Sequence, residues 1–165
     1  MICWKSGSAL ANEIRSEVLW NAFAFLKENN VGYLATLNPD GSPYCVPINY
    51  AWLDGKIVLH CAFQGQKTDN LAQNPKVAFT VYQCYEIRES EKSCSDWDVR
   101  YESVMIFGQA EFPEGEEKAK LLTDFTNSFL PPDKAVTLPE AGIRATNVIV
   151  IRPEHMTGKT SLNNA

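Results

Sequence analysis

The sequence predicts a mainly β domain with a few helices, arranged as a small antiparallel barrel whose ends the helices cover. Short stretches of alternating apolar and polar residues recur along the chain, and turn sequences such as "NPDG" and "LDGK" separate them. Only a few segments have helical character. The 165 residues suit one domain, in which residues 1–30 form an N-terminal segment and helix and residues 31–160 form the barrel with two inserted helices.

The first half of the chain predicts one helix followed by a meander of three strands. In the predicted helix, residues 12–30, apolar side chains recur at helical spacing on a face formed by Ile14, Val18, Leu19, Ala22, Phe23 and Leu26. Strands are predicted over residues 33–37, 43–52 and 57–61. The Asp54–Gly55 pair suits a hairpin turn, so the last two strands are expected side by side.

The second half adds two helices and three strands. A short helix over residues 65–74 ends before Pro75, and strands over 76–84 and 101–112 follow, with a charged loop over 86–97 between them. Gly108 inside the second strand predicts a bulge or a close approach of backbone. An amphipathic helix over 115–130, a proline-rich connection over 131–142 and a final strand from residue 145 complete the chain. The apolar side of that helix is predicted to carry Ala119, Leu122, Phe125 and Phe129.

Composition and charge argue against several classes of function. The net charge is −5 and no run of Lys or Arg is long enough for a nucleic-acid interface, so no nucleic-acid partner is expected. The N-terminal sequence has no long apolar run, so neither a signal peptide nor a membrane span is predicted. The five cysteines have no CxxC spacing, which predicts reduced thiols in a cytoplasmic protein and no metal site.

The stretch "HCAFQGQKTDN", residues 60–70, joins a buried strand to the start of the short helix. A helix that begins after Gly65 presents free backbone N–H groups, and Lys67 adds a positive charge, so this junction predicts a phosphate site. Pro47 in the neighbouring strand lacks an N–H, which places that strand at an edge or a bulge. Free backbone groups of such a strand suit a flat heteroaromatic ring. The two features together indicate a nucleotide-like cofactor.

Two blocks of the sequence resemble a known family. The first is "LATLNPDGSPYCVPINYAWLDGKIVLHCAFQGQKTDNLAQNPKVAFTV", and the second is "CSDWDVRYESVMIFGQAEF". Both blocks, and the closing "IRPEHMTGK", resemble the pyridoxamine 5′-phosphate oxidase-like FMN-binding split barrels, above all their nitroimidazole-resistance branch. The resemblance implies a six-stranded antiparallel Greek-key split β-barrel with flanking helices. It also implies FMN as the cofactor and a homodimer with FMN at the interface between subunits.

The resemblance assigns candidate FMN-binding residues. The isoalloxazine ring is expected to lie along the backbone of Val46, Pro47, Ile48, Asn49 and Tyr50. The ribityl-phosphate end is expected near His60, Cys61 and Ala62. Lys67 is expected to pair with the phosphate, with Gln66 beside it, and Ser103 to supply a hydroxyl, with Tyr101 nearby.

Three positions carry a further expectation from the resemblance. Gln66 departs from the family, since many relatives have Arg there, which implies a lower phosphate affinity or compensation by another residue. The amide of Asn70 is expected to cap or brace the helix. His60 is the candidate catalytic residue, because a histidine at this place lies close to the flavin in the nitroimidazole-resistance branch.

The function remains open between several classes. The first hypothesis is a flavin-dependent oxidoreductase that reduces a small molecule, with nitroaromatic or nitroimidazole compounds as candidate substrates. A non-enzymatic FMN- or haem-binding protein is an alternative, with His60 or His155 as an axial ligand of the haem. Pyridoxamine 5′-phosphate oxidation is a further alternative, although the Arg- and Trp-rich substrate segment of that enzyme has no counterpart in "IRPEHMTGKTSLNNA". The last alternative is a structural domain without a ligand.

Overall fold

A computed structural model describes residues 2–5, 16–88 and 98–162 of the chain. The four α-helices of this part are α1 (Ser16–Glu28), α2 (Gln66–Gln73), α3 (Gly115–Ser128) and α4 (Glu140–Ala145). The eight strands are β1 (Ile2–Lys5), β2 (Val31–Leu37), β3 (Pro43–Asn49), β4 (Ala51–Leu53), β5 (Lys56–Cys61), β6 (Lys76–Arg88), β7 (Asp98–Glu111) and β8 (Asn147–Thr160). None of the helices in these residues is long and apolar enough to cross a membrane.

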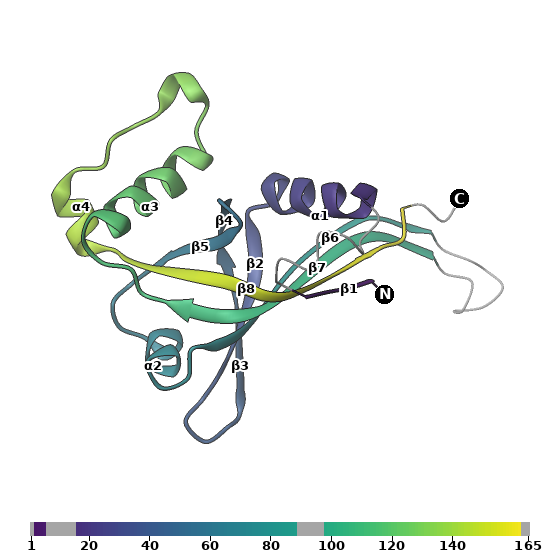
Figure 1. The fold of residues 1–165 in the computed structure, drawn as a ribbon, viewed down its shortest axis with the longest axis horizontal. Helices are drawn as coiled ribbons and strands as arrows, with labels where there is room; N and C mark the ends of the chain where they lie inside the picture. Colours follow the sequence, from purple (N-terminus) through teal and green to yellow (C-terminus); the bar gives the residue numbers. More distant parts are fainter. Residues whose placement is uncertain (1, 6–15, 89–97, 163–165) are drawn as a thin grey trace.

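All the strands belong to one antiparallel sheet with the order β3-β2-β6-β7-β8-β5-β4, and β1 pairs with β8. The two strands at the ends of this order, β3 and β4, follow each other in the chain with only Tyr50 between them. Because the ends of the sheet are joined so closely, the sheet has to curl into a half-barrel (Figure 1). The predicted fold class, mainly β with helices around a split barrel, is therefore confirmed.

The strand count differs from the six expected strands in two places. The predicted strand over residues 43–52 is divided at Tyr50 into β3, which pairs with β2, and β4, which pairs with β5. Strand β1 was not predicted at all, and its pairing with β8 joins residues at least 150 positions apart in sequence. The other strands lie where the alternation placed them, with β6 extending to Arg88, inside the segment predicted as a charged loop, and β7 beginning at Asp98, directly after that segment.

The helices also refine the sequence prediction. Among the α1 side chains that the structure describes, Ala22, Phe25 and Leu26 are buried, whereas Phe23 is exposed and stacks on Trp52 with ring centroids 5.8 Å apart. The predicted face was therefore wrong for Phe23. Its member Ile14 and the side chains of its members Val18 and Leu19 lie outside the described part of the structure. In α3 the buried side chains are Leu121, Leu122 and Phe125, while the predicted face residue Phe129 lies exposed just beyond the helix. The proline-rich connection contains a short 3₁₀ helix and α4, which the prediction missed.

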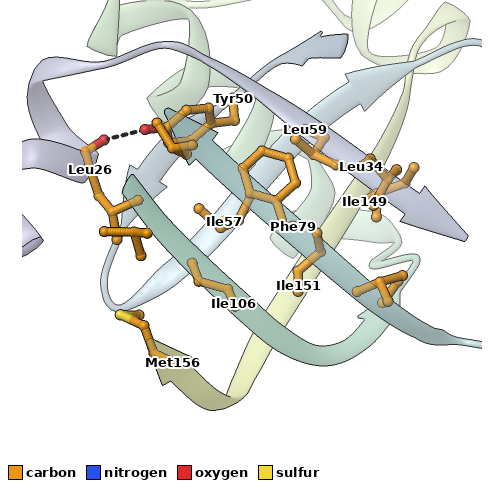
Figure 2. Close-up of a cluster of buried hydrophobic side chains, with 14 of the residues drawn as sticks. Leu26, Leu34, Tyr50, Ile57, Leu59, Phe79, Ile106, Ile149, Ile151 and Met156 are labelled. Atoms are coloured by element: carbon orange, nitrogen blue, oxygen red, sulfur yellow. Dashed lines mark hydrogen bonds between the residues drawn. The ribbon is translucent and has the colours of Figure 1, made fainter. Parts of the chain in front are cut away.

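The apolar side chains form two clusters on opposite faces of the curled sheet. The larger cluster fills the half-barrel with residues from α1 and most strands, including Leu34, Phe79 and Ile106 (Figure 2). The Tyr50 ring lies in this cluster edge-on to Phe79 at 5.2 Å, and its hydroxyl donates to the Leu26 carbonyl at 2.9 Å (Figure 2). The smaller cluster packs α3 against the outer face of β4, β5 and β8. Strands β5 and β8 are consequently buried on both faces where α3 covers them.

Gly108 lies at a β-bulge, as predicted from its position inside a strand. The register between β7 and β8 shifts between Phe107 and Gly108. A Cβ added at Gly108 would lie 2.0 Å from the Arg152 carbonyl oxygen, which belongs to the backbone and has no flexible end to move away. Only glycine therefore allows this close approach of the two strands.

We expect Gly108→Ala to lower the free energy of unfolding by about 2 kcal/mol or more, because the two backbones must separate to admit the methyl group. Urea denaturation followed by circular dichroism measures the change. Gly142→Ala in α4 is the matched control, since the nearest atom to its added Cβ is 3.8 Å away. If Gly108→Ala left the urea midpoint of unfolding unchanged, the close approach of the two backbones would not require glycine at this position.

Candidate functional site

The start of α2 is the first feature of the site. Gly65 precedes the helix with a φ of 143°, a conformation that favours glycine, and no side chain caps the helix. The first bond of the helix runs from the Asp69 N–H to the Gly65 carbonyl at 3.0 Å. The N–H groups of Gln66, Lys67 and Thr68 therefore have no acceptor within the helix, and together with the positive end of the helix dipole they suit an anion.

Lys67 lies close to the end of β5. Burial raises the pKa of the Cys61 thiol, and the positive charge of Lys67 offsets part of that effect. The Lys67 side chain is half-buried. The raised pKa keeps the thiol neutral at physiological pH.

A network of amides ties the start of α2 to the end of β2. The Asn70 side chain is 1% exposed, and its amide donates to the Thr36 hydroxyl at 3.0 Å and to the Asn38 side-chain carbonyl at 2.9 Å. The Gln66 amide donates to the same Asn38 oxygen at 2.9 Å and to the Asn70 oxygen at 3.2 Å. The Asn38 amide in turn donates to the Ser42 hydroxyl at 2.9 Å. The helix start is thereby held against the turn between β2 and β3.

This network agrees with the expected bracing role of Asn70 and gives Gln66 a partner that the sequence did not indicate. Asn38 is the residue that sequence reasoning missed, because an Asn before "PDG" looks like an ordinary turn residue. Its separation from Asn70 is 32 positions, so no local pattern announces the contact. Gln66 therefore contributes two separate groups. Its side-chain amide belongs to the network, and its backbone N–H is one of the N–H groups without a helical acceptor at the start of α2.

Strand β3 supplies the second feature of the site. It is the last strand of the sheet order and has β2 as its one ladder partner among the described strands, which confirms that the proline-containing strand lies at an edge. The side chains of Cys45, Pro47 and Asn49 are exposed, whereas Val46 and Ile48 pack against the core. In an antiparallel pair every second residue points its N–H and C=O away from the partner, so the free edge carries unpaired backbone groups.

Two of the predicted ring-binding residues have additional partners. The Asn49 amide donates to the Asn30 carbonyl at 3.3 Å. The Tyr50 hydroxyl donates to the Leu26 carbonyl and its N–H donates to the Asn30 carbonyl. Burial raises the pKa of this hydroxyl. The structure thus leaves Val46 to Asn49 as the part of this segment with a free strand edge.

The end of β5 places its residues on different faces. Cys61 points into the core, and His60 points to the opposite face, where its ring lies 4.9 Å from the Phe125 ring of α3 in an edge-to-face arrangement. The His60 side chain is exposed despite this contact, and Ala62 is exposed in the loop that leads to α2. The structure therefore brings Ala62 and Lys67 to one junction, while the imidazole lies beside α3.

Ser103 lies away from this junction within one chain. Lys76, which follows α2, pairs with Gln109 of β7, and Ser103 pairs with Tyr82 and Lys159. Six residues of a strand separate Ser103 from Gln109, which corresponds to about 20 Å. The Tyr101 ring is close by, 5.6 Å from the Tyr82 ring. A single chain therefore does not bring Ser103 together with the α2 start.

Solved structures with the same fold cover most of the chain. A FAD- and haem-binding protein from Mycobacterium smegmatis is 21% identical, with a TM-score of 0.79 over 90% of this chain and 72% of its own. A protein from Bacteroides thetaiotaomicron assigned to 5-nitroimidazole antibiotic resistance is 21% identical, with a TM-score of 0.73 over 96% and 91%. The flavocytochrome Anf3 from Azotobacter vinelandii is 20% identical, with a TM-score of 0.74 over 90% and 68%.

At these identities the likeness shows the fold alone. No curated protein matches the sequence. The model of a protein family described as pyridoxamine 5′-phosphate oxidase matches residues 21–160, a range that contains α2, β3 and the whole of the curled sheet apart from β1. The chain therefore belongs to the pyridoxamine 5′-phosphate oxidase family.

Proposed function

We propose that this protein binds FMN, with the phosphate at the start of α2 and the isoalloxazine ring along the free edge of β3. The observation that carries the proposal is the uncapped helix start, with Lys67 beside it and an open strand edge across the junction. The flavin-binding proteins among the structures of this fold support it. The residues present fit such a ligand, because they offer N–H donors and a cation for a phosphate and backbone groups for a flat ring.

Each residue has a separate part in this proposal. The N–H groups of Gln66, Lys67 and Thr68 donate to phosphate oxygens, and the Lys67 ammonium adds a point charge. The Gln66 side chain acts by holding the helix start in place through Asn38, so it does not need to replace the second cation of its relatives. Cys61 and Ala62 border the ribityl-phosphate end, and Val46 to Asn49 lie along the ring.

We further propose an oxidoreductase that reduces a small molecule, with nitroaromatic compounds as candidate substrates. A bound flavin supplies the electron transfer, and the protein positions the ring and admits the substrate. Structures of this fold include the nitroimidazole-resistance protein and a protein described as F420 reductase, at 21% and 23% identity. Haem binding is the second candidate, because one structure of this fold binds both FAD and haem and the His60 side chain is exposed.

A homodimer is the proposed assembly, and its proposed interface is an apolar face of the sheet that the described helices leave open. This face is made by two rows of paired residues that cross five strands. One row is Pro47, Tyr33, Thr80, Met105 and Thr157, and the other is Cys45, Ala35, Ala78, Phe107 and His155. Met105 and Phe107 are each 39% exposed, and Tyr33 is 46% exposed. Large apolar side chains gathered on one sheet face mark an interaction surface.

This open face accounts for the position of Ser103. Strand alternation places Ser103 on the same side of β7 as Met105 and Phe107. We propose that a second copy, bound to this face through a two-fold axis, places its Ser103 near the β3 edge of the first copy. The Ser103 hydroxyl is therefore proposed to reach the FMN bound by the other subunit.

We also propose a cytoplasmic location. The described side chains include three free thiols, at Cys45, Cys61 and Cys84, and Cys45 is exposed. Free, accessible thiols persist in a reducing compartment.

Lys67→Ala should weaken FMN binding by about tenfold, because a charged donor to the phosphate is lost while the helix remains. Titration of the apoprotein with FMN, followed by flavin fluorescence, measures the dissociation constant. Lys134→Ala, on the exposed 3₁₀ turn, is the matched control and should leave it unchanged. A purified protein that shows no flavin bands and gains none with FMN would exclude the cofactor, and a Soret band would instead support haem.

His60→Gln should lower the rate of flavin-dependent reduction of a nitroaromatic compound while the affinity for FMN stays within about twofold. The imidazole is exposed at the strand end and contacts Phe125, so its removal leaves the buried core intact. Stopped-flow measurement of flavin reoxidation by the nitro compound reads the rate directly. An unchanged rate would assign His60 a packing role against α3.

Phe107→Lys should convert the dimer to a monomer of 18.5 kDa and weaken FMN binding together with it. The added charge would have to be desolvated at the interface between the two copies. Light scattering coupled to gel filtration gives the mass, and Glu116→Lys, on the exposed start of α3, should remain dimeric. A wild-type monomer that binds FMN fully would contradict the proposed assembly.

A further inference from the structure

A cavity of about 460 Å³ lies at the opposite end of β3 from the α2 start. Its wall is formed by the end of α1, by β4 and the Tyr50 before it, and by the end of α3. Figure 1 shows these three elements close together on the side of the sheet away from α2. The seven residues of β3, about 23 Å of strand, separate the cavity from the turn that holds α2. Its volume falls within the range of sites for small ligands.

Two helices end at this cavity, and their carbonyl groups make it electronegative. Helix α1 ends at Glu28 and α3 ends at Ser128, and both residues line the cavity. No described residue donates a hydrogen bond to the carbonyl of Lys27, Glu28 or Ser128, although the earlier carbonyls of both helices have donors. Each helix end carries about half a negative charge, so the two ends add at the cavity.

The charges of the side chains that line the cavity nearly cancel one another. Lys27 and Glu28 are the two ionisable groups of opposite sign that line the cavity, and neither belongs to an ion pair among the described residues. The sign of the local field is therefore decided by the backbone, and it favours a cation. The net charge of −5 on the whole chain acts in the same direction.

Aromatic rings supply the apolar part of the wall. Trp52 is held in place by its stacking on Phe23, with an angle of 20° between the ring planes. Phe129 lies at the end of α3 with its ring 4.9 Å from Phe125, and it is 41% exposed. The faces of aromatic rings attract organic cations, and Trp attracts them most strongly.

We propose that this cavity binds a small organic cation, an ammonium compound that carries an aromatic or bulky apolar group. The carbonyls at the two helix ends and the Glu28 carboxylate face the charge, and Trp52 and Phe129 contact the apolar group. The cavity lies beyond Asn49, at the end of the β3 edge proposed to hold the flavin ring, and the inference does not depend on a bound flavin.

Titration with benzyltrimethylammonium, followed by isothermal calorimetry and by the NMR signals of the Trp52 indole and the Asn29 and Asn30 amides, tests the proposal. Saturable binding is expected, whereas benzoate and benzyl alcohol should leave these signals unshifted. Glu28→Gln should weaken binding by about threefold, and Lys27→Gln should strengthen it by a similar factor, because these side chains act with opposite sign. Glu116→Gln, at an acidic residue that is also exposed but lies outside the cavity, is the matched control.

Phe129→Leu provides a variant that does not disturb the core, since this ring is exposed, and it should also weaken binding. The proposal is overturned if benzoate or benzyl alcohol shifts the same signals as strongly as the cation does. It is equally overturned if Glu28→Gln and Lys27→Gln leave the affinity for the cation unchanged, or if the cation does not bind at all.

Discussion

The arrangement of this molecule depends on the two hydrogen bonds of Tyr50. Its N–H donates to the Asn30 carbonyl and its hydroxyl to the Leu26 carbonyl, so one residue fixes both the end of α1 and the start of β2. The N–H bond to Asn30 continues the β2–β3 register by one rung, and at the break after it the chain changes partner from β2 to β5, so β3 and β4 lie at opposite ends of the same sheet. The half-barrel follows from this break, with the Tyr50 ring packed on Phe79 inside it.

The two ends of β3 consequently have different chemistry. At its start, a buried network around Asn70 and Asn38 holds an uncapped helix start with Lys67 beside it, which suits an anion. At its end, beyond Tyr50, two helices terminate and their carbonyls suit a cation. The opposite polarity of the two ends arises from helix direction, since α2 begins at one end and α1 and α3 finish at the other.

The outer surface of the sheet is divided between a helix and a free face. Helix α3 covers the part formed by β4, β5 and β8, where Val58, Val148 and Val150 are buried beneath it. The part that includes β2, β6 and β7 keeps Tyr33, Met105 and other large apolar side chains exposed. This division is the physical argument for the proposed dimer, because the uncovered part carries apolar area that water solvates poorly.

The sequence by itself determined the features that depend on the chemistry of one residue. Pro47 lacks a donor and marks an edge strand, and Gly108 lacks a Cβ and marks a bulge, wherever the rest of the chain lies. Periodicity also determined most strands, and the uncapped start of α2 followed from Gly65. The tertiary structure alone decided the break at Tyr50, the contact of Asn38 with α2, the inward face of α1 and the distance of Ser103 from the helix start. These features are set by partners tens of residues away, and a local pattern carries no information about which distant group will complete a hydrogen bond or bury a ring.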